Sequence, residues 1–316
     1  MILNVLLLIL GFIFLIKGAD IFVDGSSSTA QNFKVPKMLI GLTIVAFGTS
    51  APEFAVSMSA LAHHNSDMVL GNVIGSCILN ILLILGVAAL IKPIKLKDST
   101  IKKELPLTIL ISALLVVLML DVSLAGDPIN RITRLDSIVM LLFFTVFIYY
   151  LVTLAKSKKD KDDEKAPFGL GKSIIFIILG LACIIIGSDL VVNNASSIAK
   201  TLGLSERVIS LTIVAFGTSL PELVTTIVSS KKGEQDLLVG NIIGSNIFNI
   251  CVVLGLPILI YGTIPTGAFN NLDLIMLVAS AIMLLVFSKT NKTITKSNGI
   301  IMLVAFAIYY TLVFIV

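Results

Sequence analysis

Residues 43–53 read TIVAFGTSAPE and residues 212–222 read TIVAFGTSLPE, so one phrase occurs twice with a single difference. A proline lacks the N–H that would bond the carbonyl four residues earlier, and its ring clashes with that carbonyl. Pro52 and Pro221 therefore predict a broken helix in each copy. Inside a membrane, irregular backbone is tolerated only where it is buried in protein or lines a cavity. The phrase is therefore a functional signal if the chain crosses a membrane.

The composition indicates an integral membrane protein. Of the 316 residues, 57% are hydrophobic and 13% are charged, and the mean hydropathy is +1.06. A soluble domain carries about a quarter charged residues. Ten apolar stretches are long enough to cross the roughly 30 Å hydrocarbon core, and they predict an all-α integral membrane protein with ten transmembrane helices. These stretches lie at about 2–24, 37–62, 69–91, 105–120, 135–155, 171–195, 207–230, 238–261, 271–288 and 299–315.

The lysines and arginines predict how these helices are oriented. Counted loop by loop, 18 lie on the same side as the charged segment 156–171, and 4 lie on the other side. The positive-inside rule places that segment in the cytoplasm and both termini outside the cell. We therefore expect a multi-pass protein of the cell membrane. Its net charge of +4 is explained by this topology and does not indicate a nucleic-acid partner, so the lipid bilayer is the expected partner. The first stretch is interpreted as a helix, not as a cleaved signal peptide, because no basic region precedes it.

Matching residues recur at a constant separation of 169 along the chain. The pairs are Gly18 and Gly187, Asp20 and Asp189, Glu53 and Glu222, Gly71 and Gly240, and Asn80 and Asn249. A constant separation predicts two homologous halves of five helices each, residues 1–155 and 172–316, joined by the cytoplasmic linker 156–171. Because five crossings are an odd number, the second half must lie upside down relative to the first. Such inverted-topology repeats are typical of secondary transporters.

Glu53 and Glu222 are the sharpest functional signals, because a carboxylate deep in a membrane costs several kcal/mol. Each follows a helix break whose carbonyls, at residues 46–49 and 215–218, can turn away from the helix axis. Together with the neighbouring Thr and Ser hydroxyls, these groups form a set of hard oxygen donors. Hard oxygens suit Ca²⁺ and Na⁺, and the set offers no thiolate or imidazole for softer metals.

A second repeated phrase follows each glutamate, LGNVIGSCILNI at 70–81 and VGNIIGSNIFNI at 239–250. Spacing of four places three polar residues on one face of each helix, namely Asn72, Ser76 and Asn80, and Asn241, Ser245 and Asn249. The paired glycines also allow close helix packing, with Asn and Ser bonding across the interface. We favour ion binding or site lining for Ser76, Asn80, Ser245 and Asn249, and helix packing for Asn72 and Asn241. The two roles can coexist.

The pair GTSxPE and GNxxGS, present in both halves, resembles the alpha repeats of the sodium/calcium exchangers of the cation/calcium antiporter superfamily. The resemblance covers essentially the whole chain. It implies a non-enzymatic antiporter without cofactors that exchanges Na⁺ for Ca²⁺ by alternating access, and we expect it to function as a monomer. It also implies that helices one and six slide as a gating pair across a core of helices two, three, seven and eight.

The resemblance further implies which residues bind the transported ions. Ca²⁺ is assigned to Glu53, Glu222 and the carbonyls of Thr49 and Thr218. Na⁺ is assigned to Ala46, Thr49, Ser50 and Ser76 on one side, and to Ala215, Thr218, Ser219 and Ser245 on the other. Some relatives carry an aspartate where this chain has Asn249, and its absence argues against K⁺ co-transport.

The number of carboxylates bears on the charge moved by the exchange. Two carboxylates neutralise one Ca²⁺ or two Na⁺, so a third Na⁺ would make the exchange electrogenic.

Other functions fit the residues less well. The same carboxylates could instead carry protons, which makes an H⁺/Ca²⁺ antiporter the alternative. A channel would share the oxygen donors, but inverted halves suit alternating access better. A hydrolase is disfavoured because the only histidines, His63 and His64, lie at a predicted helix end.

Overall fold

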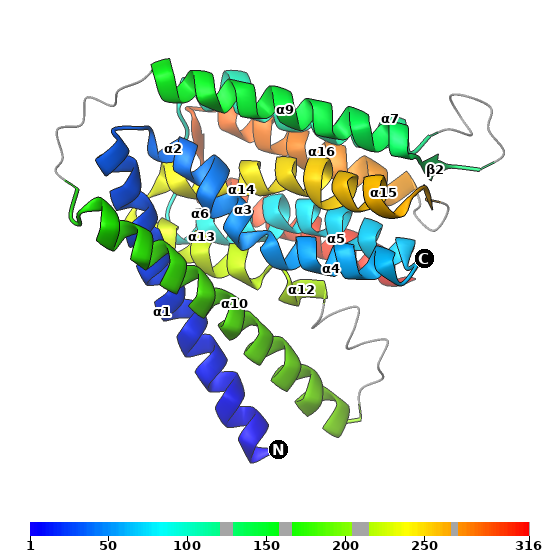
Figure 1. Cartoon of the computed structure of the whole chain (residues 1–316), viewed down its shortest axis with the longest axis horizontal. Helices are drawn as coiled ribbons and strands as arrows, with labels where there is room; N and C mark the ends of the chain where they lie inside the picture. Colours follow the sequence, from blue (N-terminus) through cyan, green and yellow to red (C-terminus); the bar gives the residue numbers. More distant parts are fainter. Residues whose placement is uncertain (121–128, 158–165, 204–214, 267–270, 316) are drawn as a thin grey trace. The chain divides into compact units, whose positions relative to one another are not determined.

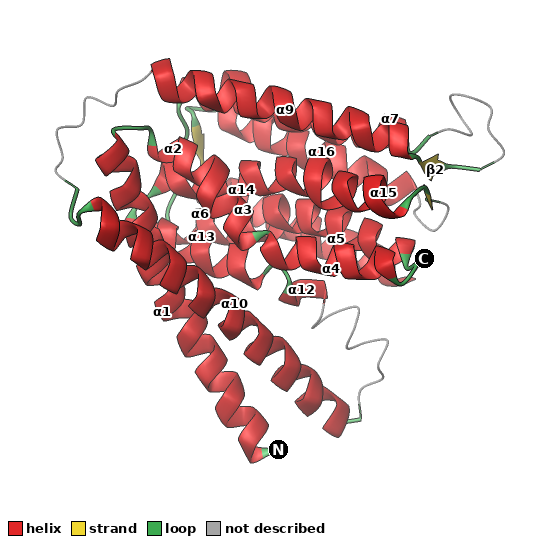
Figure 2. Ribbon diagram, viewed as in Figure 1, coloured by secondary structure: helices red, strands yellow, loops and turns green. Residues whose placement is uncertain are grey.

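The structure is a computed structural model that describes residues 1–120, 129–157, 166–203, 215–266 and 271–315. These residues are almost entirely helical (Figure 2). The chain forms two compact units, Met1–Pro52 with Ala155–Asn241, and Glu53–Leu154 with Ile242–Val316. Each unit combines a segment of the first sequence half with a segment of the second. Two of the three crossings between units fall inside the repeated phrases, after Pro52 and after Asn241.

The first unit is built from helices of very different length. It contains α1 (Ile2–Phe33), α2 (Lys37–Ile40), the π-helical segment η1 (Gly41–Val45), α3 (Ala46–Thr49), α10 (Leu170–Thr201), α12 (Ala215–Gly217), α13 (Leu220–Lys232) and the start of α14 (Gln235–Phe248). Its apolar core is formed by α1 residues such as Leu15 and Phe22, which pack with Ile184 of α10.

The second unit contains the remaining helices and four short strands. Its helices are most of α4 (Ala51–Ala62), α5 (Ser66–Leu79), η2 (Asn80–Leu85), α6 (Gly86–Ile91), η3 (Thr100–Glu104), α7 (Leu105–Leu118), most of α9 (Arg134–Ser157), the end of α14, η5 (Asn249–Leu254), α15 (Gly255–Tyr261), α16 (Asn271–Lys289) and α17 (Lys296–Ile315). Its strands are β1 (Ile94–Lys95), β2 (Arg131–Ile132), β3 (Ile264–Pro265) and β4 (Thr293–Ile294).

Seven helices among the described residues are long and apolar enough to cross a membrane. They are Ile2–Phe33, Ser66–Ile91, Arg134–Lys156, Leu170–Thr201, Gln235–Tyr261, Asn271–Lys289 and Lys296–Val313. The segments Lys37–Thr49 and Ala51–Ala62 form an eighth span if their 44° bend is counted within one crossing. The chain is thus an all-α, multi-pass membrane protein. Of the other two predicted spans, 105–120 forms the 14-residue α7, and 207–230 lies partly outside the described residues.

Helices α1 and α10 run antiparallel and side by side (Figure 1), and glycines set their close approach. A Cβ on Gly11 would lie 2.9 Å from the Gly187 carbonyl, and a Cβ on Gly18 would lie 2.9 Å from the Gly180 carbonyl. A Cβ on Gly25 would likewise lie 2.8 Å from the Ser173 carbonyl. A glycine therefore faces the partner backbone every seventh residue along α1, as in closely packed membrane helices.

Replacing Gly180 by alanine is expected to destabilise the protein, because the new Cβ would lie 2.7 Å from the Phe22 amide nitrogen. Backbone atoms cannot rotate away, so the two helices must separate at a cost of about 1 to 3 kcal/mol. Thermal unfolding of the detergent-solubilised protein measures this loss. Gly171→Ala on the same helix is the control, because its Cβ would meet nothing within 4 Å. Equal stability of the two variants would contradict the close approach.

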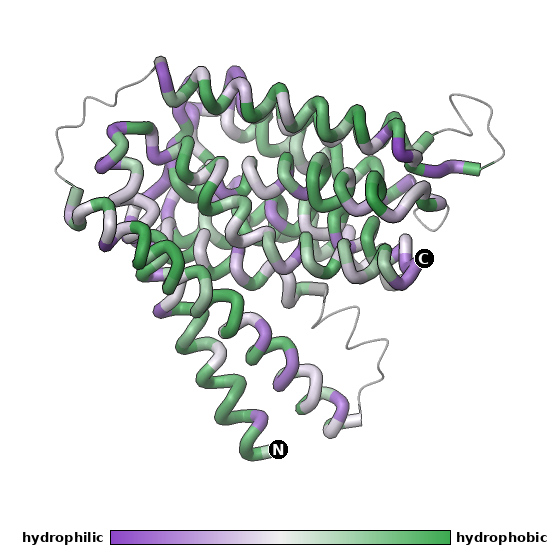
Figure 3. The backbone as a smooth tube through the Cα atoms, in the orientation of Figure 1, coloured by the Kyte–Doolittle hydropathy of each residue, from purple (hydrophilic) through white to green (hydrophobic). Residues whose placement is uncertain are grey.

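The outer faces of several helices are apolar. On α9, the exposed residues Leu135, Ile138, Leu142, Val146 and Tyr149 recur every three or four positions, which places them on one face. Hydrophobic residues run along most of α1 and α9 (Figure 3). Such faces are unfavourable in water, whereas in a bilayer they contact the acyl chains.

Two short antiparallel strand pairs link loops of the first sequence half to loops of the second. Within the second unit, β1 pairs with β4 and β2 pairs with β3. Beside the first pair, Lys292 Nζ lies 2.8 Å from Asp98 Oδ2. The hydrogen bond from Lys292 lowers the pKa of the Asp98 carboxyl below its usual value. Both loop connections are therefore made by backbone hydrogen bonds, and one is reinforced by an exposed ion pair.

Corresponding carboxylates of the two halves make the same kind of contact. Glu104 accepts a hydrogen bond from the Tyr150 hydroxyl, and Asp273 accepts one from the Tyr309 hydroxyl at 2.8 Å. Glu104 and Asp273 are 169 residues apart, as the matched residues of the sequence are. Each contact ties the start of one helix to the following helix of the same half.

Candidate functional site

The predicted helix breaks are confirmed, and they lie at corresponding serines. Ser50 separates α3 from α4 with φ −84° and ψ 7°, and Ser219 precedes α13 with φ −92° and ψ 6°. Pro52 and Pro221 each occupy the second position of the helix that follows, where the missing N–H costs no intrahelical bond. In both copies, the part of the phrase around the proline therefore begins a helix that carries a glutamate in its first turn.

In the first unit, predicted site residues from the two sequence halves lie in direct contact. Ser50 Oγ donates a hydrogen bond to Glu222 Oε1 at 2.9 Å. Thr49 Oγ1 lies 3.1 Å from Asn241 Oδ1 and 3.0 Å from its own helical acceptor, the Val45 carbonyl. Glu222, Ser50 and Thr49 are fully buried. A hydroxyl donor stabilises the Glu222 carboxylate without neutralising it, so this buried charge is suited to a cation.

The other predicted residues of the first unit occupy the same two breaks. Ala46 and Ser219 are buried, and Thr218 is half-buried. Ala215 begins α12. In each half, a short helical segment therefore precedes the break, Ala46–Thr49 in the first and Ala215–Gly217 in the second.

In the second unit, Glu53 is fully buried, and its backbone is held by an asparagine. Asn72 Nδ2 donates to the Glu53 carbonyl at 2.9 Å and to Ser57 Oγ at 3.0 Å. In the first unit, Asn241 Nδ2 correspondingly donates to Thr226 Oγ1 at 3.4 Å. These hydrogen bonds between neighbouring helices are of the kind expected if Asn72 and Asn241 serve helix packing.

The remaining predicted residues of the second unit are also buried, namely Ser76, Asn80, Ser245 and Asn249. Asn80 Nδ2 donates to Asn246 Oδ1 at 3.0 Å, and Asn246 Nδ2 donates to the Cys77 carbonyl at 3.2 Å. Among the described residues, neither Oδ1 nor Nδ2 of Asn249 has a hydrogen-bond partner. Burying a polar atom without a hydrogen-bond partner costs about 1 to 3 kcal/mol of stability, so a ligand bound to the Asn249 amide would recover this free energy.

Asn246 and the π-helical segments were not anticipated from the sequence. Asn246 is absent from the first-half phrase, where the corresponding residue is Cys77, so comparison of the copies does not mark it. The segments η2 and η5 begin at Asn80 and Asn249. These starting points are 169 residues apart, so the same rare conformation recurs in both halves. Single π turns inside α-helices are frequent at functional sites, which makes both asparagines candidates for function.

Broken helices, buried carboxylates and multiple apolar spans define a helical membrane protein of the secondary-transporter class. The family model described as "Sodium/calcium exchanger protein" matches residues 3–153 and 172–315, and the unmatched stretch between them includes the whole predicted linker. The chain therefore belongs to the sodium/calcium exchanger family and is a membrane antiporter of cations including Ca²⁺.

Comparisons with individual proteins agree. The chain is 31% identical to the sodium/calcium exchanger MaX1 of Methanosarcina acetivorans, covering 98% of both chains. It is 35% identical to the inner membrane protein YrbG of Escherichia coli, covering 99% of this chain and 98% of the other. Its fold is similar to that of the sodium-calcium exchanger NCX_Mj soaked with Na⁺ and without Ca²⁺, with a TM-score of 0.85 and 33% identity. That match covers 98% of this chain and 97% of the other.

Proposed function

We propose that this protein exchanges Na⁺ for Ca²⁺ by alternating access, and that the exchange is electrogenic and independent of K⁺. The observation that carries the proposal is the pair of fully buried glutamates, Glu53 and Glu222, each in the first turn after a helix break. Buried carboxylates at duplicated breaks are costly unless they bind cations. The relatives named as sodium/calcium exchangers support this choice of ions.

The two glutamates and the carbonyls of Thr49 and Thr218 are the proposed Ca²⁺ ligands. The proposed Na⁺ ligands are Ala46, Thr49, Ser50 and Ser76, and Ala215, Thr218, Ser219 and Ser245, with Asn80 and Asn249 lining the site. Hydroxyl and carbonyl oxygens suit both ions. Two carboxylates balance one Ca²⁺ or two Na⁺, so binding of a third Na⁺ leaves a net positive charge that moves across the membrane.

The proposed architecture has ten spans in two inverted halves. In addition to the eight apolar spans described above, η3 with α7 forms one span and the segment 207–230 forms another. Three features that recur in both halves support it, namely the Glu104 and Asp273 bonds to tyrosine, the π turns at Asn80 and Asn249, and the Asn72 and Asn241 bonds to a hydroxyl. In this arrangement both termini lie outside, and residues 156–171, of which the structure describes 156–157 and 166–171, lie in the cytoplasm. The functional unit is a monomer.

Ca²⁺ uptake into proteoliposomes tests this function. Vesicles loaded with Na⁺ and diluted into Na⁺-free medium with ⁴⁵Ca²⁺ should take up Ca²⁺, and vesicles with only a pH gradient should not. A K⁺ and valinomycin clamp that makes the interior negative should slow net uptake, because outward movement of three Na⁺ for each Ca²⁺ carries positive charge out. Uptake driven by the pH gradient alone would favour the H⁺/Ca²⁺ antiporter. Ca²⁺ entry without any counter-ion gradient would indicate a channel.

The neutral side chain of Asn249 leads to a prediction about ion selectivity. A neutral amide gives the site no spare negative charge for K⁺, so exchange by the parent protein should require Na⁺ but not K⁺. Asn249→Asp adds a third buried carboxylate, which must bind a proton or recruit another cation. Exchange by this variant should therefore depend on pH or K⁺ more strongly than exchange by the parent. Ca²⁺ uptake in K⁺-free media at several pH values measures the difference.

The control for this prediction is Asn249→Leu, which is similar in size but adds no charge. It should lower exchange without introducing a dependence on pH or K⁺. If exchange by the parent stops when K⁺ is withdrawn and Na⁺ remains, K⁺ independence is wrong.

A further inference from the structure

One face of α13 carries a continuous stripe of buried polar side chains. Glu222, Thr225, Thr226, Ser229 and Ser230 are each at most 1% exposed. Their spacing of three and four residues places them on one side of the helix, from its first turn to its last. We refer to these five residues as the α13 stripe. A row of this kind is unusual in the interior of a membrane protein, where polar side chains must find partners.

Two hydroxyls of the α13 stripe make no hydrogen bond to their own helix. In this chain, Thr29, Thr108 and Thr153 each donate to the carbonyl four residues earlier, the usual solution for a helical threonine in an apolar setting. Thr225 Oγ1 and Ser229 Oγ make no such bond and have no hydrogen-bond partner among the described residues. Burial of each hydroxyl without a partner therefore costs free energy. A cation that passes the hydroxyl, or a water molecule bound to that cation, would supply the missing partner.

The first sequence half shows that the fold does not require these hydroxyls. The positions 169 residues before Thr225, Ser229 and Ser230 are Val56, Ala60 and Leu61. Only Thr226 has a hydroxyl counterpart, Ser57, and both are bonded to an asparagine of the repeated GN phrase. The corresponding helix α4 thus begins with the same phrase and lacks the stripe, so its presence on α13 needs a reason specific to the second half.

The helix segment from Glu222 to Lys232, which contains the α13 stripe, has the length of half a membrane. From Glu222 to Lys232 the helix advances by ten residues, about 15 Å at 1.5 Å per residue. The hydrocarbon core of a bilayer is about 30 Å thick. If Glu222 lies near the bilayer centre, the last turn of α13 therefore lies at its surface.

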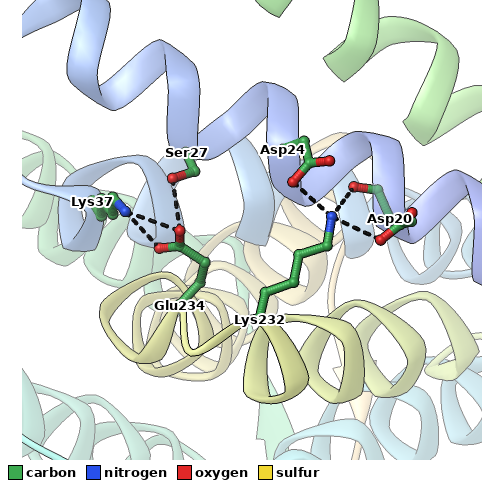
Figure 4. Close-up of polar contacts among 6 residues, drawn as sticks. All are labelled: Asp20, Asp24, Ser27, Lys37, Lys232 and Glu234. Atoms are coloured by element: carbon green, nitrogen blue, oxygen red, sulfur yellow. Dashed lines mark hydrogen bonds and ion pairs between the residues drawn. The ribbon is translucent and has the colours of Figure 1, made fainter. Parts of the chain in front are cut away.

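At that end, the Lys232 ammonium lies among three oxygens of α1 (Figure 4). They are Asp20 Oδ1 at 2.7 Å, the Asp20 carbonyl at 2.9 Å and Asp24 Oδ1 at 2.6 Å. Two residues further, Glu234 accepts a hydrogen bond from Ser27 and pairs with Lys37, each at 2.9 Å (Figure 4). The carboxylates and carbonyl around Lys232 are the groups that would bind a metal cation, and the ammonium occupies their centre.

We propose that the α13 stripe is the path by which Ca²⁺ and Na⁺ pass between Glu222 and the cytoplasm, and that Lys232, held by Asp20 and Asp24, closes its mouth. This inference rests on the proposed exchange and topology. Hydroxyls along the path replace part of the water shell of the ion, as they do in cation sites. While Lys232 stays bound to α1, its positive charge repels an approaching cation. When α1 and α13 separate, the two aspartates are released and attract cations to the opening.

Thiol accessibility tests the path. In a chain whose three cysteines are replaced by alanine, Thr225→Cys and Ser229→Cys are exposed to a membrane-impermeant cationic methanethiosulfonate reagent in inside-out vesicles during exchange. The controls are Val56→Cys and Ala60→Cys, the corresponding positions of the first half. Modification of the two α13 cysteines should be about tenfold faster than that of the controls, as expected for sites that open to water. Saturating Ca²⁺ should slow it, because the ion occupies the same path.

Loosening the mouth should speed modification. Lys232→Gln in the Ser229→Cys chain removes both ion pairs, and an exposed pair is worth about 1 kcal/mol, so the rate should rise about fivefold. Equal rates at Ser229→Cys and Ala60→Cys would overturn the path, and an unchanged rate with Lys232→Gln would overturn the closing role of Lys232. If the variants exchange Ca²⁺ normally but their α13 thiols are not modified, the path is refuted and the proposed exchange is not. Modification without Na⁺-driven Ca²⁺ uptake refutes the exchange and leaves a cation path in place.

Discussion

Replacing Glu53 or Glu222 by glutamine is expected to abolish Ca²⁺ exchange while leaving the protein folded and inserted in the membrane. Both side chains are fully buried, so the lost charge cannot be replaced by solvent. Removing one partner of a buried ionic contact costs about 3 to 5 kcal/mol, which corresponds to a loss of at least a hundredfold in Ca²⁺ affinity. Glutamine keeps the size of the side chain and can still accept the Ser50 hydrogen bond in the Glu222 variant. ⁴⁵Ca²⁺ uptake into proteoliposomes measures the effect.

Glu104→Gln is the matched control for both variants. Glu104 is also buried, and it is bonded to Tyr150 outside the proposed site, so its replacement should leave Na⁺-driven uptake close to that of the parent. Size-exclusion chromatography in detergent would verify that all three variants are folded. Near-normal uptake by a folded Glu53 or Glu222 variant would remove that residue from the site.

Cross-linking α1 to α13 is expected to stop exchange, whereas cross-linking α1 to α10 should leave it intact. If α1 and α10 move together, a bond between them constrains nothing that transport requires. The structure offers a site for each bond. Asn4 of α1 and Ser197 of α10 are joined by a 2.9 Å hydrogen bond, and Asp24 of α1 lies 2.6 Å from Lys232 of α13. Cysteine pairs at these positions can be joined by a short bifunctional thiol reagent.

Each cysteine pair serves as its own control when a reagent with a reducible bond is used. Exchange is measured before cross-linking, after it and after reduction, so any effect of the substitutions is separated from the effect of the bond. The Asp24 and Lys232 pair should lose exchange on cross-linking and recover it on reduction. Loss of exchange in the Asn4 and Ser197 pair would mean that α1 and α10 move relative to each other during transport.

Local features of the repeated phrases could be predicted from the sequence. Proline chemistry predicted a helix break before each proline, at Gly48 and Gly217, whose carbonyls lose a helical partner. The structure has the breaks two residues further along, at Ser50 and Ser219. Burial of Glu53 and Glu222 followed from their place inside apolar stretches. These predictions hold because the cause and the consequence lie within a few residues of the chain.

Features that depend on distant contacts could not be predicted in this way. The π turns at Asn80 and Asn249 have the same residue types as an α-helix, and no pattern distinguishes one extra residue per turn. Asn246 became relevant only through its bond to Asn80. Lys232 marked the cytoplasmic side in the sequence, but its position between Asp20 and Asp24 of a helix more than 200 residues earlier required the fold.

The strand pairs and the glycine-lined contact of α1 with α10 have a consequence for how this chain is assembled. Each of these interfaces joins the first sequence half to the second by backbone hydrogen bonds or close backbone packing. Phe168, near the end of the predicted linker 156–171, adds to these contacts, because its carbonyl accepts hydrogen bonds from Ser28 and Asn32 of α1. A break earlier in this linker would leave them in place. Two polypeptides cut within it, made in the same cell, would have the contacts needed to assemble as a heterodimer.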